Sequence, residues 1–124
     1  MKLEKFEDLD VWQKSMDLSK RIYELTTEGE FSSDFELRNQ IRKSSISIPS
    51  NIAEGFEREG DQEFLRFLSI AKGSAGEVRT QLLLAERIGY LSDEVTAKLE
   101  SDVKEVSKLI VGLRNYLNQS EGDK

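Results

Sequence analysis

Pro49 is the only proline in this chain, and it lies inside a segment that otherwise has the periodicity of a helix. Around it, residues 44–58 contain four serines, one asparagine and one glycine. A proline in a helix interior removes the hydrogen bond to the carbonyl four residues earlier and costs roughly 3 kcal/mol. The apolar positions keep their phase across it, from Ile41 to Ile48 to Ile52. We therefore predict one helix that is kinked at Pro49, rather than two helices.

Apolar side chains recur every three or four residues along four segments, which predicts four amphipathic helices. The predicted helices and the polar tail after them span approximately residues 9–27, 34–58, 61–88, 93–118 and 119–124. Helices joined by short loops pack as antiparallel neighbours. The expected fold is all-α: a single domain over residues 1–124 that forms an antiparallel up-down-up-down four-helix bundle.

Capping signals lie between the periodic segments. Short polar side chains satisfy the free backbone N–H groups at a helix start, and glycine is common just after a helix end. Ser33 followed by Glu36 has the spacing of a capping box. The residues expected to cap or end the predicted helices are Asp8 or Asp10, Gly29, Ser33, Asp61, Gly89 and Ser92.

The first predicted helix carries two apolar stripes, whereas a surface helix needs only one. Two interpretations stay open: the helix is central in the bundle, or its second stripe contacts another subunit. The first stripe consists of Trp12, Met16, Ser19 and Tyr23, and the second of Val11, Leu18, Ile22 and Leu25.

The third predicted helix contains Gly73 and Gly76 in its interior. Each costs up to about 1 kcal/mol relative to alanine. Counted back from the turn at Gly60, Gly73 should lie opposite Ser47 in an antiparallel hairpin. Small residues let two backbones approach closely, so we expect a close helix contact here that Gly73→Leu would disrupt.

Cysteine and histidine are both absent. The chain therefore has no thiolate nucleophile, no disulfide and no cysteine metal site. It lacks the commonest general base and the histidines of the di-metal sites found in some four-helix bundles. The serines near Pro49 have no imidazole base and no Gly-x-Ser-x-Gly elbow. We expect no enzymatic activity, no metal and no cofactor.

The formal net charge is −6. An acidic chain is disfavoured as a binder of nucleic acid or anionic membranes. No apolar run approaches the ~18 residues that cross a bilayer, and residues 1–8 lack the apolar centre of a signal peptide. We expect a cytoplasmic protein without a membrane anchor.

Several motifs together resemble the four helix bundle protein family, also called the 23S rRNA intervening-sequence protein family. The string Ser47-Ile48-Pro49-Ser50-Asn51-Ile52-Ala53-Glu54-Gly55 is the most specific of them. The others are Val11-Trp12-Gln13-Lys14, Gln40-Ile41-Arg42-Lys43-Ser44, Ile70-Ala71-x-Gly73-Ser74 and Gly89-Tyr90-Leu91. The resemblance covers nearly the whole chain.

This resemblance implies a four-helix bundle that assembles into a homopentameric ring or barrel. It also implies a link to a branch of accessory proteins of diversity-generating retroelements, which bind a reverse transcriptase and nucleic acid. That branch is strongly basic, and this chain departs from it with its net charge of −6.

Asn51, Glu54 and Arg58 share a face of the second predicted helix. They suggest either a polar site at the seam with the third helix or a hydrogen-bonded network that fixes register. In the second interpretation, Glu54 or Glu77 pairs with an arginine. The signature and register residues are Pro49, Asn51, Glu54, Gly55, Arg58, Gly73 and Glu77.

The sequence thus predicts a non-enzymatic homo-oligomeric scaffold or adaptor, a pentamer by resemblance, for an unidentified protein partner. The alternative is a nucleic-acid-binding or ribonucleoprotein accessory protein, in which basic side chains repeat around a ring. The candidate nucleic-acid contacts are Arg38, Arg42, Lys43, Arg58, Arg66, Lys72, Arg79 and Arg87.

Overall fold

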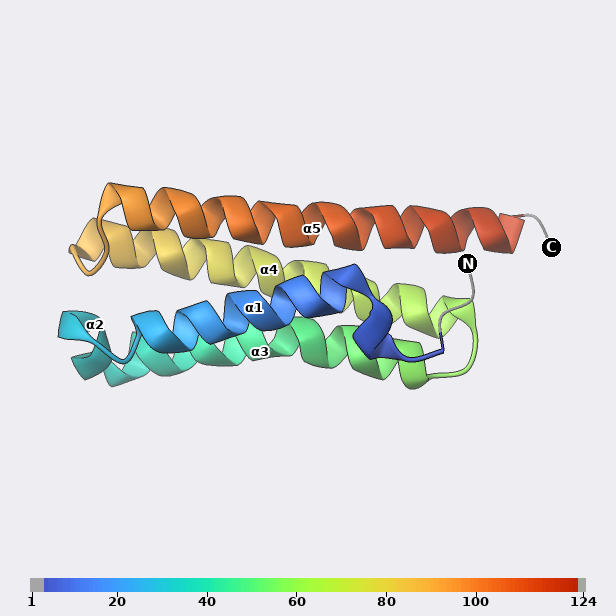
Figure 1. Ribbon diagram of the computed structural model, residues 1–124, viewed down its shortest axis with the longest axis horizontal. Coiled ribbons are helices and arrows are strands. Elements are labelled where there is room, and N and C mark those ends of the chain that lie inside the picture. The colour runs from blue at the N-terminus through green and yellow to red at the C-terminus, as the bar shows by residue number, and fades with distance from the viewer. Residues whose placement is uncertain (1–3, 123–124) are drawn as a thin grey trace.

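The computed structural model describes residues 4–122, and all regular structure within them is helical. This confirms the predicted all-α class. The four long helices lie side by side along the long axis of the molecule (Figure 1). In chain order the elements are η1 (Phe6–Asp8), α1 (Asp10–Leu25), α2 (Gly29–Ser33), α3 (Phe35–Glu57), α4 (Asp61–Ile88) and α5 (Asp93–Gly122).

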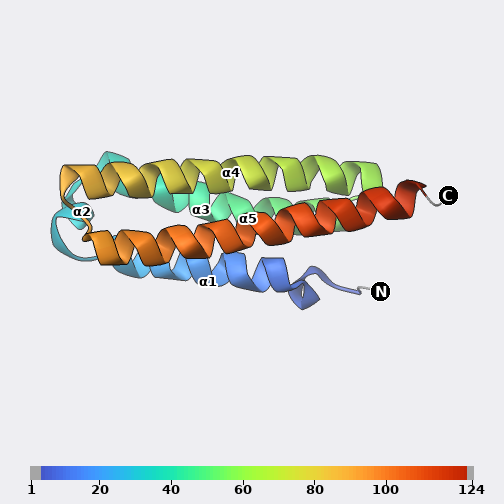
Figure 2. The ribbon, with the colours of Figure 1, turned by 90° about the horizontal axis from the view of Figure 1, so that it is seen from above.

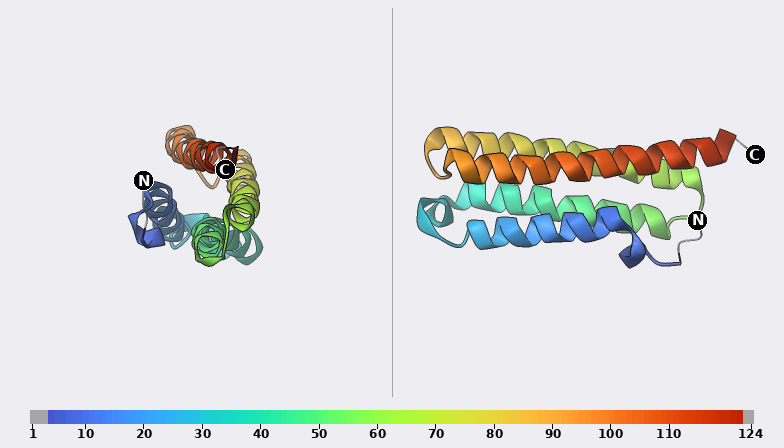
Figure 3. Two further views of the ribbon diagram at one scale, coloured as in Figure 1. Left: turned by 90° about the vertical axis from the view of Figure 1, so that its right-hand side faces the viewer. Right: turned by 45° about the horizontal axis from the view of Figure 1, so that its top comes forward.

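Each long helix packs against two others. The most extensive pair is α3 with α4, followed by α4 with α5 and α1 with α3, and a smaller contact joins α1 to α5. Seen from above, α5 lies across the bundle between α4 and α1 (Figure 2). The end view shows α3 between α1 and α4 (Figure 3). The segment containing α2 and the α4–α5 turn lie at one end, and the α3–α4 turn lies at the other (Figure 1).

One apolar stripe from each long helix forms the core, and branched aliphatic side chains fill most of it. Burial of each such side chain contributes roughly 1.5–3 kcal/mol. The side chains with no exposed surface include Ile22, Ile41, Ile48, Ile52, Leu68, Val78, Leu82 and Ile110. At one end, Phe6 of η1 packs on Trp12 and Phe56 and so holds the N-terminal arm against the body.

The two stripes of α1 have different surroundings. Val11, Leu18 and Ile22 of the second stripe are buried in the core. The interpretation in which this second stripe contacts another subunit is therefore wrong. Met16 and Tyr23 of the first stripe are exposed instead. Both stripes repeat every three or four residues, so periodicity revealed both of them but could not show which one faces the core.

The helix that contains Pro49 is continuous from Phe35 to Glu57. The prediction of one helix rather than two matches this span, while the kink at Pro49 stays a prediction.

Several predicted boundaries were wrong by one to a few residues. Leu9, without a side-chain cap, precedes α1, so neither Asp8 nor Asp10 caps it. The α1 helix ends at Leu25, and Gly29 begins α2 instead of ending α1. A helix as short as α2 is too brief to show a period, so the sequence pattern missed it.

The start of α3 is capped by Asp34 rather than Ser33: its Oδ1 accepts the N–H of Leu37 at 3.1 Å. Similarly, Gly60 precedes α4, and Asp61 is its first residue. Both shifts are one residue, the usual uncertainty of a boundary predicted from residue types.

Two boundaries lie where they were predicted. Gly89 ends α4 in the left-handed conformation with φ +98°, and Ser92 Oγ accepts the N–H of Val95 at 3.2 Å at the start of α5. In contrast, α5 continues to Gly122, so most of the expected tail at 119–124 is helical. The last two residues of that tail, and residues 1–3, lie outside the described part of the chain.

Within residues 4–122, no helix has the length and apolar character that crossing a bilayer requires.

Candidate functional site

The serines around Pro49 are used for packing the helices. Ser44 and Ser45 donate their hydroxyl hydrogens to backbone carbonyls one turn earlier in α3, at 3.0 Å each. Pro49 leaves the carbonyl of Ser45 without its helical donor. Ser19 of α1 fills that role, with its Oγ 3.0 Å from the carbonyl oxygen in a buried position. The proline is therefore compensated by the neighbouring helix.

A short hydrogen-bonded chain joins α3 to α4. The side-chain amide of Asn51 donates to the carbonyl oxygen of Ser47 at 2.8 Å and to its Oγ at 3.0 Å. Ser47 Oγ lies 2.8 Å from Ser74 Oγ of α4. This pairs the two helices at the level that counting from the Gly60 turn predicts.

Gly73, which immediately precedes Ser74, does not take part in this contact. A Cβ atom at Gly73 or Gly76 would meet nothing within 4 Å, and both residues are exposed. The predicted close approach at Gly73 is therefore wrong. Counting residues gives the level along α4, but one residue turns the side chain by about 100° around the axis.

The close approach of α3 to α4 is at Gly55. A Cβ atom there would lie 2.7 Å from the Cβ of Phe67 and 3.0 Å from Cδ1 of Phe64. Real Cβ contacts are not this short, so the absence of a side chain at Gly55 sets how closely this end of the hairpin packs.

The three polar residues predicted to share one helix face do not converge on one site, and Arg58 lies just beyond the end of α3 with an extended backbone. Arg58 Nη2 binds Glu54 Oε2 at 2.8 Å, and both side chains are about half exposed. Asn51 belongs to the serine chain. Glu77 is exposed and has no ion pair or hydrogen bond within residues 4–122. An exposed pair one turn apart contributes roughly 0.3–0.5 kcal/mol, so it holds register only weakly.

Most of the candidate nucleic-acid contacts already have partners in this chain. Arg42 donates to Thr26 Oγ1 at 2.8 Å and stacks over the Tyr23 ring. Arg79 binds Glu100 at 2.7 Å. Internal partners also hold Arg38, Arg58 and Arg66. In the described chain, Lys43, Lys72 and Arg87 form no such bond. Five of the eight side chains are therefore already engaged within the chain.

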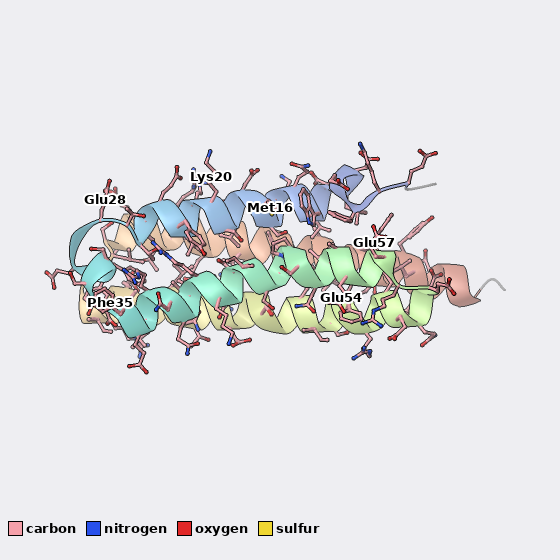
Figure 4. The ribbon with its side chains drawn as sticks, turned by 90° about the horizontal axis from the view of Figure 1, so that it is seen from below. Met16, Lys20, Glu28, Phe35, Glu54 and Glu57 are labelled. Atoms are coloured by element: carbon pink, nitrogen blue, oxygen red, sulfur yellow. The ribbon has the colours of Figure 1, made fainter. Side chains whose placement is uncertain are left out.

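An apolar groove of about 450 Å³ lies between α1 and α3. Its apolar lining is Phe6, Trp12, Met16, Tyr23, Ile46, Pro49 and Ala53. We call it the α1/α3 groove; Figure 4 looks onto this face and labels Met16 on α1. The first apolar stripe of α1 forms one wall of this groove, and the sequence pattern already indicated that stripe. The opposite wall on α3 could not be assigned without the fold.

A second groove of about 510 Å³ lies between α4 and α5. Sequence reasoning missed this α4/α5 groove because its walls come from positions about 30 residues apart. Its lining is Lys72, Ala75, Gly76, Arg79, Val103, Lys104, Ser107, Lys108 and Val111.

Two carboxyl groups with shifted pKa values lie near the α2 end. A hydrogen bond from the Leu37 backbone, and a second from the Tyr90 hydroxyl, lower the pKa of Asp34. Desolvation, together with the neighbouring Asp93 carboxyl group, raises the pKa of Glu86. Neither belongs to a cluster of three groups suited to a metal in the part of the chain that the structure describes.

The fold and these surfaces define a helical-bundle protein whose described polar groups serve mainly packing and helix capping. Residues 7–112 match the family of the 23S rRNA-intervening sequence protein, and the chain belongs to this family. A search of curated proteins gives no match.

A solved structure extends this assignment. It is a crystal structure of a protein of unknown function from the S23 ribosomal protein family of Bacteroides thetaiotaomicron. The TM-score is 0.79 with 27% sequence identity, and the match covers 85% of this chain and 95% of that chain.

Proposed function

We propose that this protein is a non-enzymatic scaffold that assembles into a ring of identical subunits, a pentamer by family resemblance. The observation that carries the proposal is the α1/α3 groove. Met16, Tyr23 and Ile46 around it are 43%, 41% and 41% exposed, although all three are large and apolar. A contiguous exposed apolar surface of this kind is typical of an interaction site.

A second apolar row on α4 supplies the complementary surface. Ile70, Leu84 and Ile88 are exposed. Ile70 and Ile88 are about five turns apart, so they lie on one side of the helix. In our proposal, α4 of one copy docks in the α1/α3 groove of the next.

The two surfaces differ, so this contact is heterologous. Each copy uses its groove for one neighbour and its α4 row for the other. A heterologous contact forms a closed ring when the rotation between neighbouring copies closes, and an open filament when it does not; the family resemblance favours the ring. The apolar lining means that docking removes few charged groups from water, which keeps the desolvation cost low.

The experiment is light scattering on the full chain at micromolar concentration after gel filtration. We expect five times the 14.2 kDa of one chain. Ile46→Glu puts a charge into the groove and should release subunits, while circular dichroism still shows the helices. Emission of Trp12, the only tryptophan, should shift to the red as the groove becomes exposed.

The matched control is Val95→Glu, which adds the same charge at an exposed apolar position of α5 outside both surfaces. It should keep the wild-type mass. A wild-type monomer at this concentration, or equal masses for wild type and Ile46→Glu, would refute the assembly.

A further inference from the structure

We propose that the α4/α5 groove binds an acidic, amphipathic segment of a partner protein. Four cationic side chains line it: Lys72 and Arg79 from α4, and Lys104 and Lys108 from α5. No carboxylate is among the lining residues, although acids outnumber bases by 24 to 18 in the chain. The groove thus has the opposite charge from the protein as a whole.

The cationic side chains of this groove have fewer anionic partners than those between α1 and α5. In residues 4–122, Lys72, Lys104 and Lys108 form no ion pair or hydrogen bond, and Arg79 alone has a partner, Glu100 at 2.7 Å. At the seam between α1 and α5, by contrast, basic groups face acids in direct pairs. Those pairs are Lys14–Glu105, Arg21–Asp102 and Lys98–Asp102.

The floor of the groove is apolar. Ala75 and Val103 are buried there, and Val111 is half-buried. At Gly76 an added Cβ would meet nothing within 4 Å, so the groove is open at this point. An occupant can place apolar side chains on the floor and acids beside the lysines.

This combination selects a polypeptide over a nucleic acid. Lysine stems present apolar surface with the charge at the tip, which suits a helix with leucine on one face and glutamate beside it. A phosphate backbone has no apolar side chains for the floor. Complementary charge steers the partner and sets its orientation.

The inference does not rest on the assembly proposed above. The α4/α5 groove and the α1/α3 groove belong to different helix pairs on opposite sides of the bundle (Figure 3). In the proposed assembly α4 also contacts the next copy, but through Ile70, Leu84 and Ile88, none of which lines the α4/α5 groove.

The test is fluorescence anisotropy of a labelled synthetic helix with the repeat Leu-Glu-Glu-Leu-Leu-Glu-Glu, added to the full chain at low salt. We expect saturable binding that weakens with salt. Lys104→Glu combined with Lys108→Glu should weaken it about tenfold or more. Lys43→Glu, an exposed lysine on α3 outside the groove, should have a much smaller effect.

Gly76→Leu adds a side chain to the groove at a position where a Cβ atom would meet nothing within 4 Å. It should also weaken binding about tenfold, because the leucine occupies the place of the peptide side chains. Gly73→Leu is the matched control: it makes the same substitution on the exposed surface of α4, outside the lining. It should leave affinity unchanged.

Three results would overturn the inference. One is no binding of the acidic helix, and another is equal binding of a version with glutamine in place of glutamate. The third is tighter binding of single-stranded poly(U) that the same groove variants abolish. Light scattering on each sample keeps the two proposals separate, because a monomer that binds the helix refutes only the assembly, and a ring that does not bind refutes only this inference.

Discussion

Ser19 of α1 donates its hydroxyl hydrogen to the carbonyl oxygen of Ser45 in α3 at 3.0 Å. That oxygen is the acceptor left without a helical donor by Pro49. Ser45 is fully buried and Ser19 is 8% exposed, so water does not readily replace this donor. The bond therefore stabilises the proline-containing turn and fixes α1 against α3.

We predict that Ser19→Ala lowers the free energy of unfolding by about 1–3 kcal/mol, because it leaves a buried carbonyl without a donor. Pro49→Ala supplies an N–H for that carbonyl within α3. In a Pro49→Ala background, Ser19→Ala should therefore cost less, with a coupling of at least about 0.5 kcal/mol. Urea unfolding followed by circular dichroism measures the cycle, and equal losses in both backgrounds would contradict the compensation.

Gly55 and Gly73 should respond to alanine in opposite directions. Gly55→Ala should lower stability by about 1–3 kcal/mol, because its Cβ would lie 2.7 Å from the Cβ of Phe67. Gly73→Ala has space around it and should raise stability by up to about 1 kcal/mol through helix propensity. Thermal unfolding compares the two directly. A drop in Tm for Gly73→Ala would revive the close helix contact predicted from sequence.

Asp34 should stabilise the fold in a pH-dependent way. Its hydrogen bonds, first from the Leu37 N–H and then from the Tyr90 hydroxyl, lower its pKa from 3.8. Since the folded pKa is lower than the unfolded one, this stabilisation is present above about pH 4 and is lost as pH falls through the folded pKa. Asp34→Ala should lower Tm at neutral pH, with a difference from wild type that shrinks in acid. Tyr90→Phe removes only the hydrogen bond from the Tyr90 hydroxyl to Asp34 and should lower Tm by less. A Tm difference between Asp34→Ala and wild type that does not change with pH would exclude this role of Asp34.

Glu86 should have the opposite pH dependence. Desolvation first, and then the hydrogen bond and charge of Asp93, raise its pKa above 4.5. A raised folded pKa means that its stabilising contribution is present below the unfolded pKa and is lost as pH rises through the folded pKa. Glu86→Gln should therefore raise Tm at neutral pH and leave it nearly unchanged near about pH 4. Glu77→Gln, at an exposed position, is the control and should leave Tm unchanged at both pH values. A Tm gain for Glu86→Gln that is equal at both pH values would contradict the mechanism.

The sequence alone determined the four long helices and the family, but not the short helix α2. Periodicity, glycine stops and short polar caps act within a few residues, so the helical segments and the boundaries at Gly89 and Ser92 followed from local chemistry. The string from Ser47 to Gly55 also pointed to the family that residues 7–112 match. Counting from the turn placed Ser47 opposite Gly73, one residue before Ser74, which Ser47 contacts in the structure.

Only the tertiary structure decided which way each helix faces. The rotation of α1 and α4 about their axes depends on the packing of all four helices together. That rotation buried the Val11–Leu18–Ile22 stripe, exposed Gly73 and moved the close contact to Gly55. It also brought Lys72 and Lys108 to one groove, although they are distant in sequence. Local patterns specify a helix and its apolar stripe, but which surfaces remain open is determined by contacts between residues far apart in the chain.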